Sequence, residues 1–221
     1  MSKYDIIAFD LDGTLSDPAQ GLLDGFVYAF RKLGIDYGER ESLRRFIGPP
    51  LADEWRKEFG FSAEEADRAV DLFREYYNIY GWWDNFMYDG IADLLASLKA
   101  AGKTVVLSTS KPQDTATDIL RLHGIYKYFD VISGHDYAAR LREKKCEVLE
   151  YALETLGVEK NSERRAACVL VGDRKFDAEG AAICGIDSAG VAWGHATAEE
   201  LNSAGFTHTV KTVDELKAFL I

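Results

Sequence analysis

The spacing of hydrophobic positions predicts one region where strands alternate with helices and one region of helices alone. Residues 6–9 are four apolar residues in a row, which is typical of a strand buried on both faces of a parallel sheet. From about residue 88 onwards, short apolar runs alternate with stretches of helical spacing, and this predicts an α/β fold with a doubly wound parallel sheet. Further strands are expected at residues 104–109, 129–133, 167–171, 188–193 and 208–210, and helices at residues 91–101, 112–122, 143–156 and 177–184.

Residues 16–86 show helical spacing without a strand pattern, so we expect them to form a bundle of four helices. Asp17-Pro18 is a favourable helix start, because Asp can cap the helix and Pro suits its first position. Gly48-Pro49-Pro50 interrupts the second helix, and Ser62 with Glu65 has the capping-box spacing that opens the fourth. The expected organisation is a core domain of residues 1–15 and 87–221, with a helical domain of residues 16–86 inserted after the first strand.

The first strand ends in two carboxylates, Asp10 and Asp12, followed at once by Gly13. While the chain stays extended both side chains leave the same face, and the carboxyl ends of parallel strands are where open α/β sheets bind ligands. An ionised carboxylate can attack an electrophile without a separate base, and a second carboxyl group can move protons. The alternatives are a solvated strand end and a calcium loop, but a calcium loop needs a glutamate where this chain has Gly21.

Hydroxyls and lysines occur at two other expected helix starts. The hydroxyls of Thr109 and Ser110 can hold a phosphate oxygen there, or can simply cap the helix. Lys144 and Lys145 open a later helix, where the helix dipole disfavours a cation unless an anion is near. The alternative for these lysines is full solvation, which is the usual fate of lysine.

A second pair of carboxylates follows another buried strand. Asp173 comes directly after the strand that ends in Gly172, and Asp177 follows four residues later. These carboxylates either meet Asp10 at the same edge of the sheet or cap the next helix. Two oxygen ligands beside a substrate phosphate and water suit Mg²⁺, which proteins usually hold with one or two carboxylates. The ion would screen the repulsion between an attacking carboxylate and a phosphate.

Composition and charge narrow the class of partner. The chain has 221 residues and a formal net charge of −11, which argues against a nucleic acid polymer or an anionic membrane as a main partner. A phosphate site would therefore have to be made cationic locally, by a metal or by lysine. The three cysteines are far apart, and no apolar run is long enough for a membrane span or a signal peptide, so we expect a cytoplasmic protein with free thiols.

Phe9-Asp-Leu-Asp-Gly-Thr-Leu15 resembles the first motif of the haloacid dehalogenase superfamily of phosphohydrolases, and three later segments resemble its other motifs in the same order. The resemblance covers the whole chain and implies a magnesium-dependent phosphatase whose inserted helical domain acts as a cap. It implies that Asp10 is phosphorylated and that Asp12 is the acid and base. Mg²⁺ would be held by Asp10, the backbone carbonyl of Asp12, and Asp173. The other implied residues are Thr109, Ser110 and Lys145 for the phosphate, with Lys144 open as the alternative lysine, and Asp177 as a supporting group.

Residues 46–51, 109–112 and 172–174 most resemble the phosphoglycolate phosphatase branch, which includes 5′-nucleotidase-like members. The implied partner is a small phosphomonoester, and phosphoglycolate, a nucleoside monophosphate, a sugar phosphate and phosphotyrosine all stay open. The alternatives are a β-phosphoglucomutase-like phosphotransferase and, from another class, a non-enzymatic phospho-aspartyl switch or binding module. We expect a monomer or a homodimer. In the resembling family the cap segment at residues 45–50 faces the site, so Arg45 is expected to contact the substrate, the alternative being an exposed helix residue.

Overall fold

The computed structural model describes residues 3–48, 50–136, 138–139 and 141–221. The chain forms two compact units: Met1–Ser16 with Met87–Ile221, and Asp17–Phe86. The expected boundary after residue 15 lies one residue before this division, and the expected boundary after residue 86 coincides with it. Pro49 in the segment expected near the substrate lies outside the described residues.

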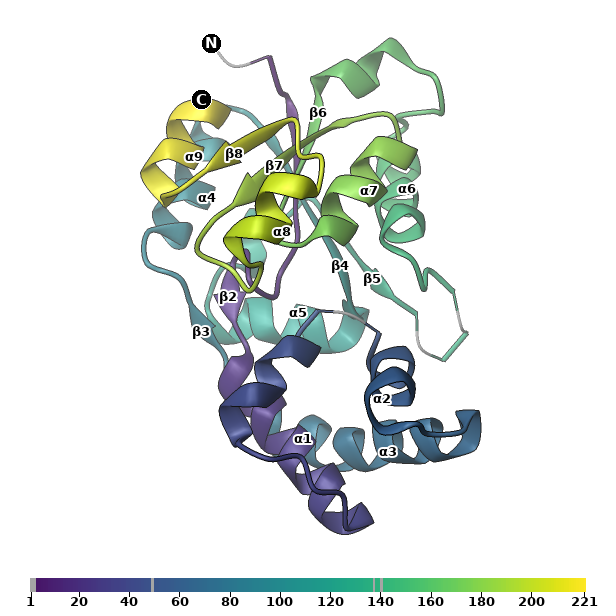
Figure 1. Cartoon of the computed structure of the whole chain (residues 1–221). Helices are drawn as coiled ribbons and strands as arrows, with labels where there is room; N and C mark the ends of the chain where they lie inside the picture. Colours follow the sequence, from purple (N-terminus) through teal and green to yellow (C-terminus); the bar gives the residue numbers. More distant parts are fainter. Residues whose placement is uncertain (1–2, 49, 137, 140) are drawn as a thin grey trace. The chain divides into compact units, whose positions relative to one another are not determined.

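A six-stranded sheet forms the centre of the larger unit, in the order β5-β4-β1-β6-β7-β8 (Figure 1). Every neighbouring pair of strands is parallel, which confirms the predicted doubly wound sheet. The uninterrupted apolar run of β1 places it in the middle, between β4 and β6, where both of its faces are covered. The strands are β1 (Ile6–Phe9), β4 (Thr104–Pro112), β5 (Val131–His135), β6 (Cys168–Gly172), β7 (Asp187–Val191) and β8 (His208–Val210).

Helices cover both faces of this sheet. Right-handed crossovers place α6, α7 and α8 on one face and α4 and α5 on the other. The last helix, α9, packs against α4 on that second face. Side chains of α6 and α7 pack on alternate residues of the central strands, such as Ile6, Ala8 and Leu170, in one buried apolar cluster. The helices are α4 (Ile91–Ala100), α5 (Gln113–Leu122), α6 (Lys145–Thr155), α7 (Lys175–Ile183), α8 (Ala198–Ser203) and α9 (Val213–Leu220), with 3-10 turns at Tyr126–Tyr128 and Glu163–Ala167.

The smaller unit is helical, as predicted, but its second helix is not an α-helix. The segment Arg40–Phe46 is a 3-10 helix, which suits a short piece that must end before Gly48. The predicted capping box is confirmed, since Ser62 Oγ accepts from Glu65 N and Glu65 Oε2 accepts from Ser62 N. Asp17 is not the N-cap residue; Pro18 is, although Asp17 Oδ1 still accepts from Ala19 N at 2.8 Å. The helices are α1 (Ala19–Leu33), α2 (Leu51–Phe59) and α3 (Ala63–Tyr76), and a π-helical turn follows at Tyr77–Gly81.

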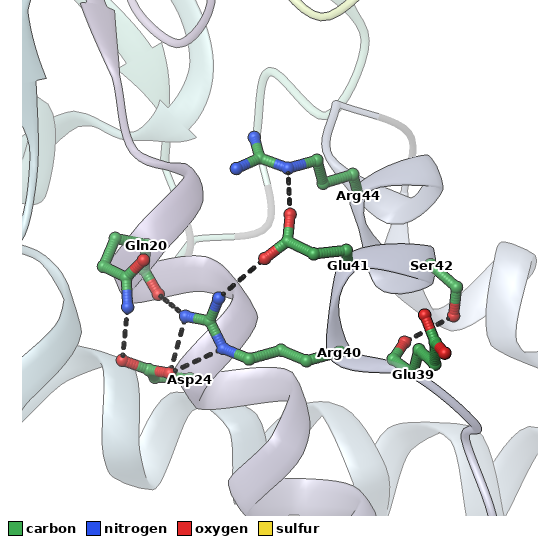
Figure 2. A network of polar contacts seen from close by, with 7 residues as sticks. All are labelled: Gln20, Asp24, Glu39, Arg40, Glu41, Ser42 and Arg44. Carbon is green, nitrogen blue, oxygen red and sulfur yellow. Dashed lines mark hydrogen bonds and ion pairs between the residues drawn. The ribbon is translucent and has the colours of Figure 1, made fainter.

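A polar network fixes the 3-10 segment of the smaller unit to α1 (Figure 2). Arg40 donates from Nε and Nη2 to Asp24 Oδ1, at 3.1 and 2.7 Å, and from Nη2 to the Gln20 carbonyl. Glu41 accepts from Arg40 Nη1 through one oxygen and from Arg44 Nε through the other. An aromatic core that includes the fully buried Trp55 fills the same unit. The network and the core together hold residues 40–46 in place.

The chain passes between the two units at two short strands, β2 (Ser16–Asp17) and β3 (Phe86–Met87), which pair with each other. Tyr88 N also donates to the Leu15 carbonyl at 3.1 Å. Of the helices that the structure describes, none combines the length and the apolar character that a bilayer crossing requires.

Candidate active site

The register of the three central strands brings the predicted site residues of the larger unit to one edge. Phe9 pairs with Leu107 of β4 and with Val171 of β6. The chain therefore continues into Asp10, Ser108-Thr109 and Gly172-Asp173 at neighbouring positions along the carboxyl edge of the sheet. This is the edge at which doubly wound folds bind ligands. The residues are far apart in sequence, and the parallel register alone makes them neighbours.

A tight turn over residues 11–16 follows Asp10 and contains Asp12. Leu11 O accepts from the backbone N–H groups of Leu15 and Ser16, and Gly13 N donates to Ser16 O at 2.8 Å. Gly13 has φ of +86°, a left-handed conformation that glycine adopts without the strain of a Cβ atom. Within this arrangement Asp10 and Asp12 each contact a different lysine.

Lys145 lies between two carboxylates. Its Nζ is 2.5 Å from Asp10 Oδ1 and 2.7 Å from Asp177 Oδ1, and all three side chains are largely buried. Burial raises the pKa of Asp10 to about 6, against the opposing effect of the Lys145 ammonium. Burial lowers the pKa of Lys145, but the two carboxylates outweigh it and raise that pKa above its usual value. Lys144 is exposed, so the structure brings Lys145 to the carboxylates and leaves its neighbour outside.

Asp173 is enclosed by backbone. A Cβ atom on Gly13 would stand 2.3 Å from Asp173 Oδ2, and one on Gly194 would stand 2.4 Å from the same oxygen. His195 N donates to Asp173 Oδ2 at 2.6 Å. The burial of this carboxyl group, together with the Asp177 and Asp10 carboxylates, raises the pKa of Asp173 well above its usual range, although the hydrogen bond from His195 opposes the shift. Asp173 Oδ1 is buried and has no hydrogen-bond partner among the described residues.

Asp177 uses both of its oxygens within the protein. Oδ1 pairs with Lys145, and Oδ2 accepts from Arg174 N at 3.0 Å at the start of α7. Gly172 gives this side chain room, since a Cβ atom there would lie 2.2 Å from Asp177 Cγ. Asp177 therefore holds Lys145 and the first turn of α7 together, and its role as a supporting group of the site stays a prediction.

Asp12 contacts a residue that sequence reasoning did not select. Its Oδ2 lies 2.5 Å from Nζ of Lys111, whose side chain is 5% exposed. The signal was available, because Lys111 directly follows the predicted hydroxyls, but lysine at a helix start is usually solvated. The site of the larger unit thus contains two buried lysines, one on each N-terminal aspartate.

The two predicted hydroxyls differ in burial. Thr109 is buried and its Oγ1 accepts from Lys111 N at 3.2 Å, whereas Ser110 is exposed. Side chains alternate along an extended chain, so Thr109 and Lys111 share the inner side while Ser110 points the other way. Arg45 belongs to the smaller unit, where Nη1 donates to the Ser42 carbonyl and Nη2 to Glu58 Oε1, each at 2.6 Å. The roles of Ser110 and Arg45 in binding stay predictions.

The carboxylates of this site offer ligands for a divalent cation. Asp10, Asp173 and Asp177 each present an oxygen within 4.8 Å of the other two. Asp173 Oδ1 is buried without a hydrogen-bond partner among the described residues, so a cation beside it would compensate a carboxylate oxygen that the protein leaves unpaired. Oxygen ligands of this kind suit Mg²⁺. Because both Asp177 oxygens are engaged, Asp10 and Asp173 are the better candidates among these three.

Comparison with known proteins gives a consistent picture. Residues 7–191 match the family model described as haloacid dehalogenase-like hydrolase. Among curated relatives, the tyrosine-protein kinase PtkA of Mycobacterium tuberculosis is 38% identical over 97% of this chain and 72% of its own length. A 5′-nucleotidase of Pseudomonas aeruginosa is 34% identical over 99% and 96%, and a phosphoglycolate phosphatase of Vibrio parahaemolyticus is 30% identical over 98% and 96%. A solved structure of a predicted phosphatase from Clostridium acetobutylicum has a TM-score of 0.89 at 37% identity, covering 97% of both chains.

Proposed function

Because the chain belongs to the haloacid dehalogenase-like hydrolase family, we propose that it is a magnesium-dependent phosphatase that hydrolyses a small phosphomonoester through a phospho-aspartyl intermediate. The observation that carries the proposal is that Asp10, Lys145 and Asp173 lie together at the carboxyl edge of the sheet. Lys145 Nζ holds one oxygen of Asp10, and His195 N holds one oxygen of Asp173. The names of the relatives support a phosphatase, and the chemistry of the site suggests how it would act.

Asp10 is the proposed nucleophile. One carboxylate oxygen attacks phosphorus while the bond to the leaving oxygen breaks, and Asp12 gives a proton to that oxygen. A water molecule then attacks the phosphoryl group, and Asp12 takes a proton from this water. The bond between phosphorus and the Asp10 oxygen breaks, which frees the Asp10 carboxylate and gives inorganic phosphate. Lys145 anchors Asp10 Oδ1 and leaves the other oxygen for the attack. Lys145 and Thr109 would bind the non-bridging phosphate oxygens.

Mg²⁺ is the proposed cofactor of this site. It would be held by Asp10 and Asp173, with the backbone carbonyl of Asp12 as a further ligand. When bound, it would neutralise charge on the phosphate so that an anionic carboxylate can approach. The hydrogen bond from His195 N fixes Asp173 Oδ2 and so orients the second, unpartnered oxygen. Gly13 and Gly194 leave the space that this carboxylate occupies.

The substrate class rests on the relatives and on the groups that the site offers to a ligand. Relatives named 5′-nucleotidase and phosphoglycolate phosphatase cover nearly the whole chain, which favours a small phosphomonoester. The residues at the sheet edge engage only a phosphoryl group and its leaving oxygen. We therefore propose that the unit Asp17–Phe86 acts as the cap domain that selects the rest of the substrate.

A second candidate is transfer of the phosphoryl group to a hydroxyl other than water. The observation that favours it is the 38% identity to a relative named tyrosine-protein kinase. The same phospho-aspartyl intermediate could donate to an alcohol or phenol, as a mutase-like transferase would require. Following labelled phosphate separates the two candidates: release as inorganic phosphate at every turnover supports hydrolysis, whereas stoichiometric appearance on an added hydroxyl compound supports transfer.

The decisive variant is Asp10→Asn, assayed on a panel of phosphoglycolate, nucleoside monophosphates, sugar phosphates and phosphotyrosine. We expect turnover on the best substrate to fall to background, and the acid-quenched wild type to carry a phosphoryl group that hydroxylamine removes. Asp5→Asn is the matched control, because Asp5 precedes the same strand at its opposite end and its side chain is 78% exposed. Substantial activity in Asp10→Asn on any substrate would refute the mechanism.

Metal dependence is tested separately. EDTA should silence the enzyme and Mg²⁺ should restore it, but Ca²⁺ should not. Calcium accepts looser and higher coordination, so it would misplace the attacking carboxylate. Full activity in EDTA would rule out the cofactor while leaving the role of Asp10 to the first experiment.

A further inference from the structure

Lys111 is a buried cation that the proposed mechanism does not yet use. Its side chain is 5% exposed, and its Nζ lies 2.5 Å from Oδ2 of Asp12, which comes from a segment 99 residues earlier in the sequence. Placing an ammonium group inside a protein is costly unless an anion compensates it. A lysine in this setting therefore needs an anionic partner, and Asp12 supplies one.

An irregularity in β4 places Lys111 at the site. Between two successive pairings with β5, β4 advances from Ser108 to Pro112 while β5 advances only from Ser133 to His135. The extra length of β4 forms a bulge, a device that redirects side chains next to active sites. Thr109 and Lys111 are both buried here, while Ser110 between them is exposed. The bulge thus presents a hydroxyl and an ammonium group on one side of the strand.

The two carboxylate oxygens of Asp12 have different surroundings. Oδ2 is bound by Lys111, whereas Oδ1 is buried and has no hydrogen-bond partner among the described residues. Asp173 shows the same division, with Oδ2 bound by His195 N and Oδ1 unpartnered. In both residues, one oxygen fixes the orientation of the carboxyl group and the other stays available for a ligand or a proton.

We propose that Lys111 is a positioning residue that holds Asp12 through Oδ2 so that Oδ1 exchanges protons with the leaving oxygen and later with water. This inference rests on the proposed function, in which Asp12 protonates the leaving oxygen as the phosphorus–oxygen bond breaks. Without Lys111, the Asp12 side chain is free to rotate, and proton transfer requires a heavy-atom approach within hydrogen-bond reach. The role is specific to proton transfer, so it predicts an effect that depends on the leaving group.

The test compares kcat/KM of Lys111→Met on an alkyl phosphate and on p-nitrophenyl phosphate. An alkoxide needs a proton to leave, whereas p-nitrophenolate leaves readily without one. We expect kcat/KM to fall about 100-fold on the alkyl phosphate and by less than about tenfold on p-nitrophenyl phosphate. The parameter kcat/KM is used because it reports steps up to departure of the first product, and so it excludes the later attack of water.

Lys103→Met is the matched control. Lys103 directly precedes β4 at its other end, its side chain is 10% exposed, and its Nζ donates to the Tyr4 carbonyl. Its removal should cost stability in thermal unfolding without any dependence of kcat/KM on the leaving group. The double variant Asp12→Asn with Lys111→Met should lose little more than Asp12→Asn alone, because Lys111 acts through Asp12.

Several outcomes would overturn the inference. Equal losses on both substrates, or a higher KM on both with unchanged kcat, would mean that Lys111 supports the fold or binds the phosphoryl group itself. Full additivity in the double variant would mean that Lys111 acts without Asp12. A selective loss in Asp12→Asn without one in Lys111→Met overturns this inference and leaves the proposed function standing. Equal losses on both substrates in Asp12→Asn would remove the acid role of Asp12, and the inference would fail with it.

Discussion

Gly194 lies directly against the carboxylate of Asp173, so that a Cβ atom on this glycine would stand 2.4 Å from Asp173 Oδ2 and 2.4 Å from the Gly13 carbonyl. Neither neighbour can yield easily, since one is a proposed metal ligand and the other is backbone. The segment that follows β7 thereby shapes the site, and His195 in the same segment donates its N–H to Asp173. The geometry leads to a prediction about metal binding.

Gly194→Ala should displace Asp173 and weaken Mg²⁺ binding by about 10- to 100-fold, as changes to the groups that orient a metal ligand commonly do. The measurement is the Mg²⁺ concentration that gives half-maximal activity. Gly205→Ala is the control, because Gly205 has φ of +82° and no neighbour within 4 Å of an added Cβ. That control should cost about 1 kcal/mol of stability from backbone strain and leave the Mg²⁺ requirement unchanged. An unaltered Mg²⁺ requirement in Gly194→Ala would contradict the prediction that crowding at Gly194 disturbs metal binding through Asp173.

Lys145→Met should abolish most activity, whereas Lys144→Met should change it little. Lys145 is buried between Asp10 and Asp177, and Lys144 is exposed. Removing the buried cation also leaves two carboxylates uncompensated, so we expect a loss of about 3 kcal/mol in the free energy of unfolding. Steady-state kinetics and denaturant unfolding of both variants decide the matter. If Lys144→Met were the more damaging variant, the phosphate contact would have to be assigned to Lys144.

The stability of the metal-free protein should depend on pH through Asp10. Burial raises the pKa of this carboxyl group from 3.8 to about 6. A group whose pKa is higher in the folded state stabilises the fold below its unfolded pKa, and that contribution is lost as the pH rises through the folded value. Thermal unfolding in EDTA should therefore show Asp10→Asn gaining stability relative to wild type between about pH 4 and pH 7. A constant difference across this range would mean that Asp10 ionises as easily in the folded protein as in the unfolded chain.

Arg45→Ala should lower kcat/KM for the best substrate by about 10- to 100-fold, about 1.4 to 2.7 kcal/mol, if its guanidinium contacts an anionic leaving group. Activity on p-nitrophenyl phosphate, whose leaving group carries no carboxylate or second phosphate, should change much less. The structure supplies a sharper control, because Arg45 also binds Glu58 and the Ser42 carbonyl. Glu58→Gln removes the anionic partner of that ion pair and keeps the cation. Equal losses on both substrates in Arg45→Ala, shared by Glu58→Gln, would assign Arg45 to the fold of the smaller unit.

The spacing of hydrophobic residues was sufficient to predict the parallel sheet and to predict that Asp10 and Asp173 lie at one edge of it. An unbroken apolar strand can only be buried on both faces, and strands that alternate with helices must lie parallel. Once the strands are parallel, carboxylates that follow β1 and β6 meet at one edge, and Asp10 and Asp173 do so. These predictions depend only on which segments are strands or helices and on their order. They therefore hold even if the boundaries of an element are misplaced by one or two residues. The prediction for Arg40–Phe46 was less robust. This segment forms a 3-10 helix and not an α-helix, because few residues remain before Gly48.

The tertiary structure alone decided which of two adjacent side chains turns inward and what each carboxylate touches. The side chains of adjacent residues point in directions that differ by about 100° on a helix and about 180° on a strand. A shift of one residue along the sequence therefore decides whether a lysine is buried or solvated. In the folded protein Lys145 is buried and Lys144 is exposed. Likewise Thr109 and Lys111 are buried, while Ser110 between them is exposed. The pairing of Lys111 with Asp12 requires both the bulge in β4 and the turn at Gly13. Contacts between segments so far apart are fixed by packing and register, and no local pattern in the sequence records them.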